Sequence, residues 1–97
     1  MLDPVKIEIN GTLDLHNFNP KDVSELVAEF IFACHAKKIY LGKIIHGKGI
    51  GTLREIVHSK LNSHQLVKDF WQGDEMSGSW GVTLFTLHEN NKYTTFI

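Results

Sequence analysis

Residues 44–55 have the sequence IIHGKGIGTLRE, and this stretch decides the fold. Ile44 and Ile45 end an apolar run that is typical of a buried strand. Glycines then follow at alternate positions, and a helical pattern starts directly after the last of them. A strand, a glycine-rich turn and a helix in this order indicate an α/β fold, in which such turns lie at the carboxyl edge of the sheet.

The same turn has the chemistry of an anion site. Glycines let backbone N–H groups converge on one anion, and the helix start adds unpaired donors and the positive end of its dipole. We therefore expect a phosphate group to bind here, held by Gly47, Lys48, Gly49, Gly51 and Arg54. The alternative is that the glycines only permit the strand-to-helix turn, and both interpretations can hold together.

The rest of the chain predicts three more strands and one more helix. Alternating polarity predicts a half-buried strand over residues 5–16. Asn19 followed by Pro20 is typical of a helix start, and the apolar spacing carries that helix to about Lys37. Further strands are expected at 39–45, 66–71 and 80–87, with the second helix at 50–62.

The order of these elements, βαβαββ, predicts a two-layer α/β sandwich. We expect a mixed four-stranded sheet with two helices on one face. Helical connections imply parallel pairing among the first three strands, and the short loop before the fourth suits an antiparallel return.

Length and composition indicate one small domain. The 97 residues, 42% of them hydrophobic, suit a single core over about residues 5–87, followed by a polar tail at 88–97. Cys34 is the single cysteine, which favours a reducing compartment, and it lies on an apolar helical stripe as an inert core thiol. No apolar run approaches the roughly 20 residues that span a bilayer, so we expect a cytoplasmic protein without a membrane partner.

Charge is distributed unevenly along the chain. The net charge is −1, yet residues 35–68 carry seven basic residues against Glu55 alone, a net +6. This basic third contains the glycine turn. Either it folds into a local patch that suits a polyanion, or its charges disperse over different faces.

Three residues are candidates for catalysis at the same edge. Asp14 and His16 share the non-core face of the first strand, and parallel pairing should bring them to the edge where His46 precedes the turn. Phosphodiester cleavage needs proton transfer and charge neutralisation at the phosphate. His16 or His46 would shuttle protons, while Asp14 would orient His16 or a water, or bind Mg²⁺ together with the substrate phosphate. The alternative is that these residues form structural hydrogen bonds, with His46 shaping the turn.

Other polar and aromatic residues receive no functional role. No pair of histidines has the tight spacing of a structural zinc site, so no protein metal site is expected. Trp71 and Trp80 are interpreted as core or rim packing rather than as platforms for stacked bases. The remaining histidines are interpreted as surface residues: His35, His58, His64 and His88.

Three motifs together resemble the Smr (small MutS-related) domain. They are LDLH at residues 13–16, IHGKGIGTLR at 45–54 and GSWGVT at 78–83, and the resemblance covers residues 5–87. It implies a βαβαββ sandwich that binds nucleic acid and, in many members, nicks or cleaves DNA or RNA. Smr domains occur fused to larger MutS-type proteins and as small free-standing proteins, and this chain resembles the latter. It departs from the pattern at Asn17, where many members have glycine.

Two other functions stay open. The first is a nucleic-acid-binding or recruitment module without catalysis, within a larger repair or translation complex. The second is a binder of a small phosphorylated ligand, which is weakened because the turn has neither the P-loop pattern nor the dinucleotide-binding pattern. The choice between DNA and RNA, and any dependence on Mg²⁺ or Mn²⁺, is left open by the sequence.

Overall fold

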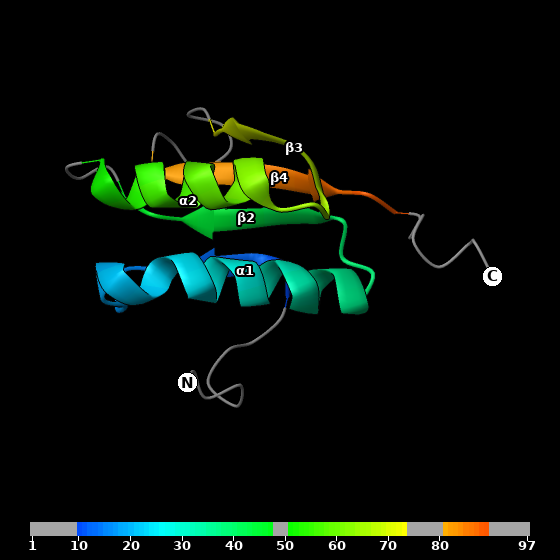
Figure 1. Cartoon of the computed structure of the whole chain (residues 1–97), viewed down its shortest axis with the longest axis horizontal. Helices are drawn as coiled ribbons and strands as arrows, with labels where there is room; N and C mark the ends of the chain where they lie inside the picture. Colours follow the sequence, from blue (N-terminus) through cyan, green and yellow to red (C-terminus); the bar gives the residue numbers. More distant parts are fainter. Residues whose placement is uncertain (1–9, 48–50, 74–80, 90–97) are drawn as a thin grey trace.

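The computed structural model describes residues 10–47, 51–73 and 81–89. These form a four-stranded sheet in the order β1-β2-β4-β3, with two helices on one face (Figure 1). The elements are β1 (Thr12–Asp14), α1 (Pro20–Ala36), β2 (Leu41–Ile45), α2 (Thr52–Ser63), β3 (Val67–Gln72) and β4 (Val82–Leu87). The predicted two-layer sandwich with a mixed sheet is therefore confirmed. The first half of the strand predicted at 5–16, Trp80, and most of the tail lie outside the described residues.

Two of the three predicted strand pairings are confirmed, the parallel pairing of β1 with β2 and the antiparallel pairing of β3 with β4, whereas the predicted pairing of β2 with β3 was wrong. β1 pairs parallel with β2, so that Asp14 lies opposite Ile45. β3 does not pair with β2, because β4 lies between them and pairs antiparallel with both. The physical reason is that β4 carries no charged residue and suits a central strand, whereas β3 carries Lys68 and Asp69 and suits an edge.

The two helices begin differently. The side chain of Asn19 accepts a hydrogen bond from the backbone N–H of Lys21 at 3.0 Å, and Pro20 occupies the first helical position of α1. α2 instead starts at Gly51, whose φ of 82° places it in the left-handed region, and no side chain caps it. The first backbone donors of α2 are therefore left without a side-chain acceptor.

The core lies between the sheet and the helices. Phe85 of β4 meets Phe30 of α1 edge to face, with ring centroids 6.1 Å apart. Across the sheet, the Phe85 ring covers Gly42 so closely that a methyl group at Gly42 would overlap it. Cys34 is fully buried in this core, and burial raises the pKa of its thiol to about 11. The expected core location of Cys34 is thus observed.

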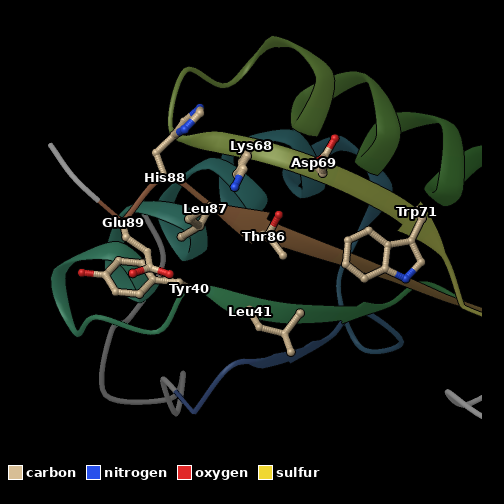
Figure 2. A pocket seen from close by; sticks show the side chains of 9 residues that line it. All are labelled: Tyr40, Leu41, Lys68, Asp69, Trp71, Thr86, Leu87, His88 and Glu89. Atoms are coloured by element: carbon tan, nitrogen blue, oxygen red, sulfur yellow. The ribbon is translucent and has the colours of Figure 1, made fainter. Parts of the chain in front are cut away.

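The other face of the sheet is open. A groove of about 710 Å³ crosses its far end, away from the glycine turn, and Figure 2 shows Leu41, Thr86 and Trp71 along it. Leu41 is 58% exposed and Trp71 is 45% exposed. Trp71 therefore lines the open face and lies outside the core, which was one of the two positions, core or rim, that the sequence indicated for it. The described part of the chain contains no helix long and apolar enough to cross a bilayer.

Candidate functional site

The sheet register brings Asp14 and His46, two of the predicted site residues, to one edge. The N–H of Leu15 donates to the carbonyl of Ile45 at 2.9 Å, which continues the β1–β2 ladder beyond Asp14. The N–H groups of His46 and Gly47 both donate to the carbonyl of Gly81, at 2.8 and 2.9 Å. The carboxyl ends of β1 and β2 and the start of β4 therefore meet where α2 begins.

A cavity of about 280 Å³ opens at this edge, between the end of β2 and the first turn of α2. Its lining consists of Pro20, His46, Gly47, Gly51, Thr52, Leu53 and Arg54. The positions from Thr52 to Arg54 are those whose backbone N–H groups have no acceptor within the helix, since the first intrahelical bond runs from Glu55 to Gly51. The start of α2 thus places backbone donors, the positive end of a helix dipole and the guanidinium of Arg54 beside this cavity, whose exposed lining is mostly apolar.

Gly47 and Gly51 are required by backbone conformation. Their φ angles are 84° and 82°, which favour glycine, although a methyl group at Gly47 would have free space around it. These two glycines permit the turn and also line the cavity. Lys48 and Gly49, which the sequence places in the same phosphate site, lie outside the described residues.

Asp14 and His16 form a hydrogen-bonded pair at the surface. One carboxylate oxygen of Asp14 accepts from the backbone N–H of His16 at 3.0 Å and lies 2.8 Å from its Nδ1. These bonds, the side-chain one first, hold the pKa of Asp14 below its usual range. The carboxylate can then only accept, so Nδ1 of His16 donates to it. The His16 side chain is 70% exposed, and its Nε2 is the ring nitrogen left to meet a substrate.

His46 lies inward on the helix-covered face and has different partners. Its Nδ1 lies 3.1 Å from the carbonyl of Gly47, and its Nε2 lies 2.8 Å from the hydroxyl of Thr83. The residue is only 7% exposed, and burial is the main cause that lowers its pKa, with Arg54 adding to the effect. His46 is therefore held in its neutral form with both ring nitrogens engaged.

His58 belongs to the same hydrogen-bond network, and assigning it to the surface was wrong. Its Nε2 lies 2.8 Å from the hydroxyl of Thr83, a residue with no exposed surface. Burial is the main cause that lowers the pKa of His58, and the positive charge that His46 would carry when protonated and the guanidinium of Arg54 lower it further. The sequence contained one signal for this position: His58 follows Arg54 by one helical turn, on the side of α2 that carries the site.

The basic third of the chain does not gather at this edge. Arg54 lies in the first turn of α2 beside the cavity. Lys37 instead caps the carboxyl end of α1, and the 17 residues of that helix separate Lys37 by about 25 Å from Pro20, which lines the cavity. Lys60 lies in the last turn of α2, and Lys68 lines the groove on the open face. Among the described residues, dispersal is therefore the better description, with local positive charge at Arg54.

Comparisons with known proteins agree with this architecture. A family model of the Smr domain matches residues 13–88. This chain belongs to the Smr family. An endonuclease MutS2 from Brevibacillus brevis is 36% identical over 79 residues, which cover 81% of this chain and 10% of that protein. An endonuclease MutS2 from Pelotomaculum thermopropionicum is 32% identical over 80 residues, 82% of this chain and 10% of that protein.

Solved Smr structures share the fold. The Smr domain of Thermus thermophilus MutS2 superposes with a TM-score of 0.75 at 25% identity, covering 79% of this chain and 96% of that one. YdaL, a stand-alone small MutS-related protein from Escherichia coli, gives a TM-score of 0.73 at 23% identity and covers 79% of this chain and 63% of that one. The chain spans about a tenth of the length of the curated MutS2 relatives that it matches.

Proposed function

We propose that this Smr domain binds nucleic acid through its phosphate backbone and nicks it as an endonuclease. The observation that carries the proposal is the cavity at the start of α2, which lies on the same sheet edge as the Asp14–His16 pair. The names of the MutS2 relatives, which are endonucleases, support the same reaction class.

The cavity suits one backbone phosphate. Its donors are the unpaired amides of the first turn of α2 and the guanidinium of Arg54. Lys48 follows Gly47 in the sequence, and we assign it to the same phosphate as a third donor. At about 280 Å³ it lies at the lower end of the roughly 300–1,000 Å³ of pockets that enclose whole small-molecule ligands. This favours a phosphate presented by a polymer over a buried free nucleotide. Contacts of this kind do not read bases, so we expect binding to be largely independent of sequence.

Proton transfer is assigned to the Asp14–His16 pair. Asp14 holds Nδ1–H of His16, which directs the lone pair of Nε2 outward as a general base for the attacking water. The protonated imidazole next to Asp14 can then return the proton to the leaving oxygen. His46 completes the predicted catalytic set, but it can exchange a proton with substrate only after releasing Thr83 or the Gly47 carbonyl.

A divalent metal would enter with the substrate. The described residues contain no cluster of three or more His, Cys, Asp or Glu that could hold a metal ion. Mg²⁺ keeps several waters and commonly binds through one or two carboxylates together with substrate phosphates. Asp14 is exposed at the site edge and could supply that single carboxylate for Mg²⁺ or Mn²⁺, which would neutralise phosphoryl charge.

A non-catalytic binding module is the second candidate. It is favoured by the engagement of both His46 nitrogens within the protein, which is the arrangement of a residue that shapes a turn. Recruitment into a larger repair or translation complex fits this candidate too. The two candidates share the phosphate site and differ only in whether the Asp14–His16 pair performs proton transfer.

Binding is tested by salt dependence with a matched pair of variants. For about three phosphate contacts, the slope of log affinity against log salt should be about −2 to −3, on either DNA or RNA. Arg54→Ala should reduce the slope by about one and weaken binding to all sequences alike. Lys68→Ala removes an exposed cation of the open-face groove (Figure 2) and should leave the slope unchanged. Equal effects of the two variants, or a wild-type slope near zero, would refute the assigned phosphate site.

A further inference from the structure

The buried hydroxyl of Thr83 links three elements, because it is hydrogen-bonded to both His46 and His58. Thr83 of β4 lies with its oxygen 2.8 Å from Nε2 of His46, at the end of β2, and 2.8 Å from Nε2 of His58, on α2. The two imidazole rings are nearly perpendicular, with centroids 6.2 Å apart. The ring of Phe70 also packs against His58, with centroids 5.3 Å apart.

The direction of these hydrogen bonds follows from counting hydrogens. The carbonyl of Gly47 can only accept, so His46 carries its proton on Nδ1. The unprotonated Nε2 of His46 must then accept from the hydroxyl of Thr83. Because that hydroxyl has a single hydrogen, it can only accept from His58, whose Nε2 carries a proton. The chain runs one way, from His58 through Thr83 and His46 to the Gly47 carbonyl.

We propose that His58 is a positioning residue of the phosphate site, which acts through Thr83 to lock His46 in one tautomer on the Gly47 carbonyl. The hydrogen-bond chain starts on the helix whose first turn lines the cavity and ends at Gly47, which lines the same cavity. It therefore fixes how the end of β2 sits against the start of α2. This inference rests on the proposed function, and it gives His46 the role of holding the turn.

The alternative is that His58 only fills space beside Phe70. Two variants separate the possibilities. His58→Phe keeps an aromatic ring against Phe70 but removes the donor to Thr83, whereas His58→Gln keeps an N–H donor on a side chain of similar reach. Thr83→Ser, which retains the hydroxyl, is a third variant for the same measurements. Thermal unfolding followed by circular dichroism establishes that each variant is folded.

The first readout is the tautomer of His46, measured by ¹⁵N NMR of its ring nitrogens at pH 8. The wild type should show Nδ1–H, and His58→Phe should reduce the preference for that tautomer by about tenfold, the worth of one hydrogen bond. His58→Gln and Thr83→Ser should keep it. A wild-type His46 protonated on Nε2, or an unchanged tautomer in His58→Phe, would overturn the proposal.

The second readout is the affinity for inorganic phosphate, followed through the amide signals of Gly47 and Gly51. His58→Phe should weaken the binding of phosphate about five- to tenfold, as expected when one hydrogen bond no longer holds the site. His58→Gln should stay within about twofold of the wild type. Equal affinities in the wild type and His58→Phe would overturn the positioning role. A wild type that binds neither phosphate nor nucleic acid would refute the proposed function and the positioning role together. The tautomer readout distinguishes that failure from failure of the hydrogen-bond chain.

Discussion

Replacing Thr83 by valine tests whether the buried hydroxyl holds the site edge together. Valine has almost the shape of threonine, so the change removes two hydrogen bonds with little change in packing. His46 is 7% exposed, and leaving its Nε2 unpaired should cost about 1–3 kcal/mol of the free energy of unfolding. His58 is less buried and regains part of its bond from water, while the added methyl group returns about 0.8 kcal/mol.

We therefore expect Thr83→Val to lower the free energy of unfolding by about 1–3 kcal/mol, and Tm by about 5–15 °C. Urea denaturation gives the first quantity and circular dichroism on heating gives the second. Thr86→Val is the matched control: it makes the same change in the same strand, but on the open face, and should stay within about 0.5 kcal/mol of the wild type. If Thr83→Val is as stable as Thr86→Val, the Thr83 hydroxyl does not stabilise the site edge, and its assigned role in the hydrogen-bond network is refuted.

Three further predictions concern stability and reactivity. Burial lowers the pKa of three histidines, which are His46, His58 and His64. Their contribution to stability is complete above the unfolded pKa of about 6.5 and is lost as pH falls through the pKa values of the folded state. The free energy of unfolding should then fall by up to about 1.4 kcal/mol per pH unit for each histidine. Urea denaturation from pH 8 to pH 5 should show this fall, and a flat profile would contradict it. Gly42→Ala should cost about 1–3 kcal/mol in urea denaturation, because its methyl group meets the Phe85 ring, and Phe85→Leu in the same chain should recover part of that loss. The Cys34 thiol, with a pKa of about 11, should react with a disulfide reagent at pH 8 only as fast as the protein unfolds, so rapid labelling of native protein would show that the core opens locally.

Much of the fold was predictable because the spacing of apolar residues in each segment indicates which of its faces is buried. The alternation around Leu13 and Leu15 and the helical stripe of α1 gave the right elements in the right order. The antiparallel pairing of β4 with β3 was predicted, but the insertion of β4 between β2 and β3 was not, because a period of two fixes which face a residue occupies and not which strand lies beside it. The relevant signal was the absence of charged residues from β4 and their presence in β3, since charged side chains are typical of edge strands.

The site was predictable where it depends on local sequence. Glycines with positive φ at both ends of the turn and a helix start without a cap follow from residues 44–55. The parallel register then brings Asp14 and His16 to the same edge. The role of His58 was missed because its partner Thr83 is 25 positions away along the chain. No periodicity within a helix indicates which polar flanking residue will meet a buried hydroxyl from a distant strand.

Nicking of supercoiled plasmid by the purified domain, with and without Mg²⁺ or Mn²⁺, tests the central claim most directly. The wild type and Glu25→Gln, which removes an exposed charge from α1, should convert supercoiled plasmid to the nicked form at equal rates. Asp14→Asn should slow that conversion by about 10²–10⁴-fold, the usual contribution of general acid–base catalysis, while binding stays within about threefold. A wild type that leaves plasmid, linear DNA and structured RNA all intact would contradict the endonuclease account. Equal loss of cleavage and binding in Asp14→Asn would show instead that Asp14 shapes the binding edge.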